Sequence, residues 1–296
     1  MTKKRKILLG VAAVYVLGLV VFAVLFGIKG HKNEGFLPQE EFHLLTWFTI
    51  IGPITFNKGV LYLLIAAAMT IGTMTWVSKR MTMRPNRVQT AVEAFYNLTV
   101  GMTRENMDNR MAKKWFPVIC TLFLFILFSN LIGYIPLPVN SGESFKLFGL
   151  DIPSFQIYAA DTNVGFPLML ALIVFFAFNY EGVKAHGPIG YLKSLVPDGV
   201  EGGMKAFIFP LEIVSNFLRL LSLTIRLWAN LLAGHLLIAF MAGDLAVLLG
   251  LQLLGWFTLP FGIVLFLFES VLIAGLQAFI FAILAAIYLG SAVTKH

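Results

Sequence analysis

The sequence contains one cysteine and few charged residues, and both shortages restrict what the chain can be. Cys120 has no second cysteine to pair with, so an internal disulfide is excluded; within an apolar run it is typical of a small buried side chain. Charged residues make up only 12% of the 296 residues, against 58% hydrophobic residues and a mean hydropathy of +0.84. Soluble globular proteins carry about 25% charged residues. The composition therefore predicts a polytopic membrane protein.

Motifs of bond chemistry are also missing. The sequence has no glycine-rich phosphate loop, nucleophile elbow or metal-ligand cluster, so we expect no enzyme activity in the chain itself, no cofactor and no metal. It also has no internal repeat, which disfavours transporters built from inverted repeats. Only His235 among the five histidines lies within an apolar segment, so a haem or quinone subunit with paired axial histidines is disfavoured.

Six apolar segments run along the chain, at residues 7–28, 58–78, 116–136, 162–183, 207–242 and 245–293. The first four have about the 20 residues that span a bilayer. The last two would reach roughly 50 and 70 Å as helices, against a hydrocarbon core of about 30 Å, so they must tilt strongly or break. Asp244 marks a tight external turn between them, and Pro260 is expected to kink the second. The predicted fold is all-α, with a long tilted C-terminal hairpin.

The positive charges predict the orientation. Sixteen of the 22 lysines and arginines lie on one side of the segments and four on the other, so the positive-inside rule predicts that both termini are cytoplasmic. The net charge of +7 thus follows topology and does not indicate nucleic-acid binding. A secretory signal usually has an apolar region of about 7 to 15 residues, whereas the first segment is longer, which favours a retained anchor. We divide the chain into an N-terminal anchor with an external loop, residues 1–57, and a membrane domain, residues 58–293, whose hairpin is 207–293.

An amphipathic helix is predicted on the cytoplasmic surface between the second and third spans, over residues 87–106. Its apolar residues at helical spacing include Val88, Val92, Phe95 and Met102. Residues 136–158 outside and 184–205 inside are expected to be irregular connections. Asp161 and Asn163 are expected to cap the fourth span, because both residue types favour helix starts.

Three charged residues interrupt the fifth apolar segment at intervals of seven: Glu212, Arg219 and Arg226. An arginine at the bilayer centre costs about 2.5 to 3.5 kcal/mol on insertion scales, which indicates a function. Seven residues return to nearly the same angle at about 100° per residue, so the three charges form one stripe along the helix. The polar residues that share this stripe are Ser215, Ser222 and Asn230.

The chemistry of the stripe favours proton handling. Arg226 keeps its proton because the pKa of a guanidinium is above about 12, so it can attract carboxylates but cannot relay protons. Glu212 and His235 can bind and release protons, and they lie toward opposite ends of the segment. His235 also falls on the side of the helix opposite Arg226. Two proton-active groups on either side of a fixed cation predict two half-paths that do not join, because the positive charge repels a proton.

Four stretches of the sequence resemble subunit a of rotary F-type ATP synthases. The signature stretch is SLTIRLWANLLAGH, with Ser222, Arg226, Asn230 and His235. The closing GLQAFIFAILAAIYLG, which contains Gln277, resembles the last helix of that family. Upstream, FPVICTLFLFILFSNLIGYIP and AADTNV are similar to further family elements, so the resemblance covers roughly residues 58–293.

The resemblance implies a stator subunit in the inner membrane of a bacterium, where proton transport drives ATP synthesis. The implied partners are a rotating ring of c subunits with one membrane carboxylate each, the peripheral stalk subunit b and the lipid bilayer. Arg226 would face the ring, with Ser222 as a small polar neighbour, and Glu212 would belong to the cytoplasmic half-channel. The residues implied in proton entry from outside are Asn230, His235 and Gln277.

Glu269 departs from the family pattern. Many relatives with a histidine nine residues after the arginine carry a glutamate seven residues before the glutamine of the last helix, a position that here is Ser270. Glu269 comes one residue earlier, which is about 100° of rotation. Glu269 is therefore expected to point away from His235 unless a π-bulge near Gly275 corrects the register.

Other interpretations of these polar residues stay open. Arg219 can pair with Glu212 inside the hairpin or extend to a lipid headgroup. Asn230 and Gln277 can hydrogen-bond between helices, as amides often do in membranes. A secondary transporter or anion pore that binds its substrate with Arg219 and Arg226 is the second functional hypothesis.

Overall fold

The structure is a computed structural model that describes residues 5, 10, 13–21, 46–51, 54–82, 86–147, 150–194, 204–241, 249 and 251–293. The chain divides into two compact units. The larger unit comprises Leu44–Leu231 and Leu272–His296, and the smaller unit comprises Met1–His43 and Leu232–Val271.

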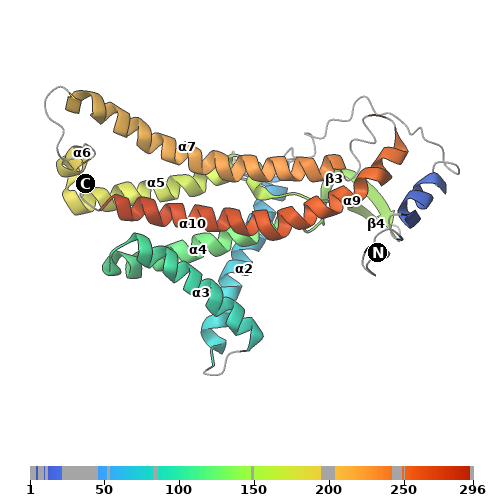
Figure 1. The fold of residues 1–296 in the computed structure, drawn as a ribbon, viewed down its shortest axis with the longest axis horizontal. Coiled ribbons are helices and arrows are strands. Elements are labelled where there is room, and N and C mark those ends of the chain that lie inside the picture. The colour runs from blue at the N-terminus through green and yellow to red at the C-terminus, as the bar shows by residue number, and fades with distance from the viewer. Residues whose placement is uncertain are drawn as a thin grey trace. The chain divides into compact units, whose positions relative to one another are not determined.

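Five helical segments among the described residues are long and apolar enough to cross a membrane, which confirms the all-α polytopic fold class. They are α2 (Lys58–Arg80), α4 (Asn109–Gly133), α5 (Gly165–His186), α7 (Met204–Ala239), and a last segment made of α9 (Gln252–Phe268), the π-helix η4 (Glu269–Ile273) and α10 (Ala274–Ser291), all drawn in Figure 1. Most of the first predicted segment, residues 7–28, lies outside the described residues. The described stretch within it, 13–21, is helical.

The two long C-terminal segments differ in regularity. The helix α7 continues for 36 residues, including Pro210 near its start. The last segment changes from α- to π-helical hydrogen bonding at Glu269 and returns at Ala274. Pro260 lies inside α9, which continues on both sides of it. The predicted turn at Asp244 lies outside the described residues.

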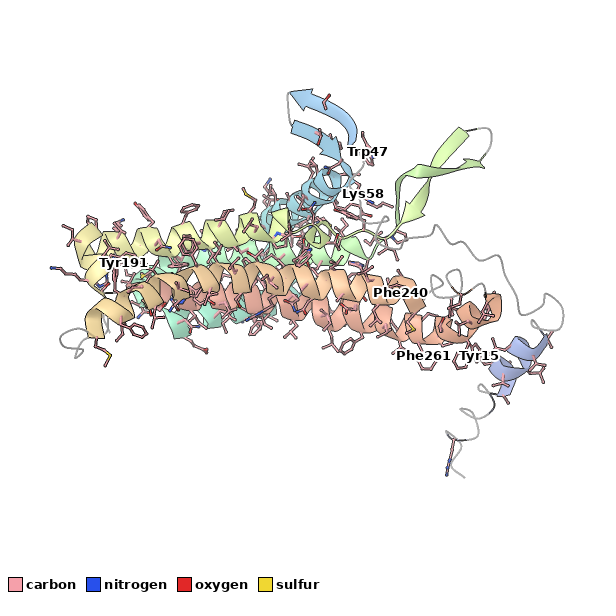
Figure 2. All side chains as sticks on the ribbon, turned by 90° about the horizontal axis from the view of Figure 1, so that it is seen from above. Tyr15, Trp47, Lys58, Tyr191, Phe240 and Phe261 are labelled. Carbon is pink, nitrogen blue, oxygen red and sulfur yellow. The ribbon has the colours of Figure 1, made fainter. Side chains whose placement is uncertain are left out.

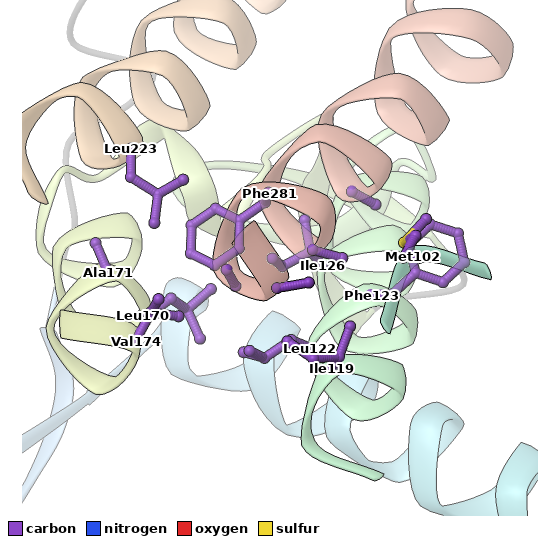
Figure 3. Packing of buried hydrophobic residues seen from close by; sticks show 14 of the residues in the cluster. Met102, Ile119, Leu122, Phe123, Ile126, Leu170, Ala171, Val174, Leu223 and Phe281 are labelled. Atoms are coloured by element: carbon purple, nitrogen blue, oxygen red, sulfur yellow. The ribbon is translucent and has the colours of Figure 1, made fainter. Parts of the chain in front are cut away.

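The core of the larger unit forms around α4 and α10. Small residues cover one face of α10, where Ala274, Ala278, Ala282, Ala285 and Ala286 are all buried. Such residues let membrane helices approach closely and gain van der Waals contact. In Figure 3, Phe281 of α10 lies between Leu223 of α7 and Leu170 of α5 on one side and Ile126 of α4 on the other, and all four belong to one buried cluster. Four spans therefore contribute to one apolar core.

The predicted amphipathic helix is α3 (Arg87–Asn106), with the bounds that the sequence indicated. The Asn86 side chain accepts a hydrogen bond from the Arg87 amide at 2.7 Å. Thr99, Met102 and Thr103 are buried, and α3 packs against α4 and α10. The helix is thus part of the packed core of this unit as well as amphipathic.

The prediction of an irregular segment at 136–158 is wrong. Strands β3 (Leu137–Leu147) and β4 (Leu150–Gln156) form an antiparallel hairpin there, because two adjacent extended stretches can satisfy their own backbone groups. A second hairpin, β1 (Thr46–Ile51) with β2 (Ile54–Asn57), precedes α2, and Figure 2 labels Trp47 and Lys58 where this hairpin meets the helix.

The segment 184–205 is also more ordered than expected, because it contains the short helix α6 (Pro188–Ser194). Gly187 has a φ of 74°, a left-handed conformation that glycine adopts without strain and that ends α5. The ring of Tyr191 then packs on Gly182, where a Cβ would overlap it. The Tyr191 hydroxyl donates to Asn179 Oδ1 at 3.0 Å, which holds α6 against α5.

Candidate functional site

One face of α7 attaches the helix to the larger unit. Leu223, Leu227 and Leu231 are four residues apart and buried. Trp228 Nε1 donates to the carbonyl oxygen of Thr162 at 2.9 Å, next to this face. These contacts fix the rotation of α7 and therefore decide which residues it presents outward.

The outward face of α7 is apolar and open. Its exposed large residues in the larger unit include Val214, Phe217, Leu218, Leu221 and Ile225. The polar stripe borders this face, with Ser222 and Asn230 exposed and Arg226 half-buried. An open apolar helix face inside a membrane must be covered by lipid or by other membrane helices.

Arg226 has neither an ion-pair nor a hydrogen-bond partner in the part of the chain that the structure describes. A cation at membrane depth normally pairs with an acid, a carbonyl or water. At the edge of the open face, the guanidinium of Arg226 therefore has no counter-charge from the described residues.

Arg219, by contrast, has partners within the larger unit. Its Nη2 lies 3.6 Å from Glu212 Oε1, and its Cζ lies 5.5 Å from the centroid of the Tyr288 ring. The side chains of Arg219 and Glu212 are 33% and 31% exposed, so the chain itself covers neither completely. These contacts support the interpretation that Arg219 pairs with Glu212. The Glu212 side chain is paired but remains partly exposed.

In the smaller unit, Glu269 lies against α7 at Gly234. A Cβ at Gly234 would overlap the carboxyl group of Glu269, so the absence of a side chain makes room for the carboxylate. His235 follows Gly234 in the chain and is buried. The structure therefore brings Glu269 to the stretch of α7 that contains His235.

The register of Glu269 is altered by η4. A π-helical turn pairs residue i with i+5, one residue more than an α-helical turn, so it shifts the register by about one residue, or about 100°. That is the amount by which Glu269 departs from the family spacing. The π-helix occupies Glu269–Ile273, slightly before the predicted location at Gly275. Ser270 Oγ donates to the Leu267 carbonyl oxygen of its own helix at 3.4 Å.

The two candidate amides have different surroundings. Gln277 is buried in α10, whereas Asn230 is exposed on α7. Near Gln277, Asn130 Nδ2 of α4 donates to the Ala274 carbonyl oxygen at 3.1 Å, so α4 and α10 are joined by a polar contact at this level. Among the described residues, no group of three histidine, cysteine or acidic side chains could hold a metal ion.

Sequence reasoning missed a buried polar cluster before α5. Asp161 is fully buried in the 3-10 helix η2 (Ala160–Thr162) and accepts a hydrogen bond from Ser129 Oγ at 2.9 Å. Lys58 Nζ lies 4.6 Å from the ring centroid of the buried Tyr158. Burial raises the pKa of Asp161 to about 7, although the Ser129 hydrogen bond opposes the shift.

The capping prediction holds only in part, because the N-cap position of α5 is Val164, which makes no side-chain cap hydrogen bond. Asn163 Oδ1 accepts from the Gly165 amide at 2.9 Å, at the start of α5, whereas Asp161 points to Ser129 of α4. The cap preference of aspartate concealed this role. The sequence did contain a signal for this contact, namely a serine near the end of one apolar span and an aspartate just before the next.

The chain matches known proteins over most of its length. A family model described as ATP synthase A chain matches residues 60–290. A protein of Rhodopseudomonas palustris (strain BisA53) named ATP synthase subunit a is 35% identical over 262 residues, which are 86% of this chain and 97% of that protein. Proteins of the same name from Rubrobacter xylanophilus and Nitratiruptor sp. are each 34% identical, over 80% and 84% of this chain and 83% and 96% of their own lengths.

Proposed function

The chain belongs to the ATP synthase A chain family, and from this premise we propose that it provides two offset proton half-channels that Arg226 keeps apart. As a member of that family it is the proton-translocating stator subunit of an F-type ATP synthase, a membrane channel subunit of the complex. The proposal assigns individual residues to this activity.

The proposed partner at the open face of α7 is the ring of c subunits, and the peripheral stalk subunit b is proposed as a second partner, in a bacterial inner membrane. One observation carries the first assignment: Arg226 is half-buried, has no described partner, and borders an exposed apolar face. An apolar rotor helix with one carboxylate complements that face in both polarity and charge.

In the proposed cycle, Arg226 promotes proton release from each ring carboxyl group that passes. A guanidinium within about 4 to 6 Å lowers the pKa of a carboxylic acid by about 1 to 3 units, which favours the carboxylate. The attraction at 4 Å is about 4 kcal/mol at an effective dielectric near 20, before desolvation is subtracted. An encounter of this strength can form and break as the ring turns.

Glu212 is proposed to exchange protons on the cytoplasmic side, and Asn230, His235, Glu269 and Gln277 on the opposite side. The partial exposure of the Glu212 side chain supports the first assignment. The approach of the Glu269 carboxyl group to Gly234, beside His235, supports the second. Ser222 is proposed as a small polar residue that leaves space beside Arg226. The permanent charge of Arg226 would repel a proton crossing directly between the two sides.

The proposal is tested by replacing Arg226 in the assembled complex and measuring ATP synthesis driven by an imposed pH gradient in proteoliposomes. Arg226→Ala should abolish synthesis, and Arg226→Lys should restore little, because an ammonium lacks the planar fork of a guanidinium. The exposed Arg104 of α3 supplies the matched control, since Arg104→Ala should leave synthesis unchanged. Wild-type coupling in Arg226→Ala would refute the proposal.

The transporter or anion-pore hypothesis makes a different prediction, namely that the purified chain alone moves a solute into liposomes. Its two-arginine substrate site is disfavoured because Arg219 already has Glu212 and Tyr288 as partners. Solute flux through the chain alone, lost in Arg226→Ala, would support it.

A further inference from the structure

We propose that the groove between α2, α3 and α4 binds an anionic phospholipid of the surrounding bilayer, with an acyl chain in the groove and the phosphate beside Arg80. This site lies in the larger unit, on helices other than the one that carries the polar stripe. It does not depend on the proton half-channels.

The groove has the size and polarity of a ligand site. It encloses about 620 Å³, within the about 300 to 1,000 Å³ typical of such sites. Its walls are mostly apolar and include Val77 of α2, Ala91 and Phe95 of α3, and Cys120, Phe123 and Leu127 of α4. It extends along α4 from Phe116 to Leu131, which is about 22 Å at the rise of an α-helix. A long apolar slot of this kind suits a hydrocarbon chain.

A smaller pocket of about 250 Å³, with a larger share of polar lining than the groove, adjoins it, and both share Val77 and Met81 as lining residues. Arg80, Thr82 and Gln89 line this pocket. Gln89 Nε2 donates to the Thr82 carbonyl oxygen at 2.9 Å and to Glu93 Oε1 at 2.7 Å, so Gln89 has a defined orientation. An apolar groove with polar side chains at one end matches a phospholipid, which has apolar acyl chains and a polar headgroup.

Arg80 supplies the charge complementarity. Its side chain is exposed, its Cζ lies 5.9 Å from the centroid of the Trp76 ring, and no acidic side chain in the described part of the chain pairs with it. A guanidinium of this kind can bind a phosphate through two parallel hydrogen bonds. The phosphate of a zwitterionic phospholipid is offset by the ammonium of its own headgroup, and an apolar helix has no charge, so an anionic phospholipid balances this cation best.

The depth of Arg80 in the bilayer fits a headgroup. The helix α2 has 23 residues and is about 34 Å long, close to the hydrocarbon thickness, and its last turn holds Lys79 and Arg80. Arg80 therefore lies near the headgroups when α2 spans the membrane, with the apolar groove at hydrocarbon depth. Basic pockets between membrane helices are known to bind acidic headgroups.

The experiment uses the assembled complex in phosphatidylcholine nanodiscs that contain a trace of phosphatidylglycerol with a photoreactive acyl chain. After illumination, mass spectrometry of peptides locates the adducts. We expect adducts on the α4 peptide around Cys120 and Phe123. Arg80→Gln should lower their yield about fivefold, since one cation near the membrane surface contributes roughly 1 kcal/mol. Ala91→Trp, which fills the groove, should remove them, and Arg104→Gln on the far end of α3 should not change them.

A photoreactive phosphatidylcholine serves as the second probe. Equal labelling of the groove by both lipids, unaffected by Arg80→Gln, would overturn the proposal of an anionic ligand. Adducts of neither lipid in the groove would show that no lipid occupies it and would also overturn the proposal.

Discussion

The helices α4 and α7 are both long and apolar, but the chain buries them to very different extents. In the most apolar stretch of each, 44% of the residues of α4 are buried, against 11% in α7. The chain thus covers much of α4 by itself, whereas it leaves most of α7 exposed. High hydropathy describes both helices and does not distinguish a core helix from an interface helix.

Their polar groups differ in the same way. Around α4, Ser129 bonds Asp161, Asn130 bonds a carbonyl of α10, and Lys114 pairs with Glu181 of α5. On α7, Arg226 has no described partner. The polar residues around α4 therefore bond within the chain, whereas Arg226, unlike Arg219 and Trp228 of the same helix, does not do so among the described residues.

The largest effect on stability is expected from Gly290→Val, where α10 meets the end of α3. A Cβ at Gly290 would overlap the backbone carbonyl oxygen of Asn106, which cannot move as a side chain can. The cost should exceed the about 1 to 3 kcal/mol of ordinary overpacking. Gly72→Val in α2, where nothing lies within 4 Å, is the matched control. Detergent unfolding of the purified chain measures both, and equal midpoints would contradict this packing.

A pair of isoleucines tests the comparison directly. Ile126 of α4 is 0% exposed and Ile225 of α7 is 51% exposed. Ile126→Ala should lower the free energy of unfolding by about 2 to 3 kcal/mol through the cavity it leaves, whereas Ile225→Ala should change it by less than about 0.5 kcal/mol. Unfolding of the isolated chain provides the measurement. A larger loss in Ile225→Ala would mean that α7 is a core helix.

The buried Asp161 should make stability depend on pH. Its folded pKa of about 7 exceeds the ordinary value of 3.8, so between these values the folded chain holds a proton that the unfolded chain has released. Stability is therefore greatest below about pH 4 for this group and falls as pH rises toward 7, by about 2 kcal/mol from pH 5 to 7. Asp161→Asn should flatten this slope in unfolding titrations, and an unchanged slope would exclude Asp161 as its origin.

The smallest expected effect is functional. Gly234→Ala should displace the flexible Glu269 carboxyl group without unfolding the chain and reduce proton transport several-fold. Gly275→Ala, with nothing within 4 Å, is the control. Proton pumping by vesicles that contain the complex tests the pair. Wild-type pumping in Gly234→Ala would show that the position of this carboxylate is unimportant.

Much of the fold could be predicted from local sequence patterns. The spans follow from runs of apolar residues, and the helix over 87–106 follows from the helical spacing of its apolar residues. Both are local patterns, so the existence and approximate bounds of these elements could be predicted. The hairpin at 137–156 could not, because Pro138, Gly142 and Pro153 indicate a loop unless strand pairing is known. Asp161 was mistaken for a cap for the same reason: its partner, Ser129, lies 32 residues away.

The sequence by itself determined that Glu212, Arg219 and Arg226 form one stripe, because the period of a helix is a local property. Only the tertiary structure decided that Arg219 pairs with Glu212 while Arg226 borders an open face, and that η4 shifts the register of Glu269 toward Gly234. Those outcomes depend on which side of each helix is buried, and that is set by packing between residues far apart in the chain.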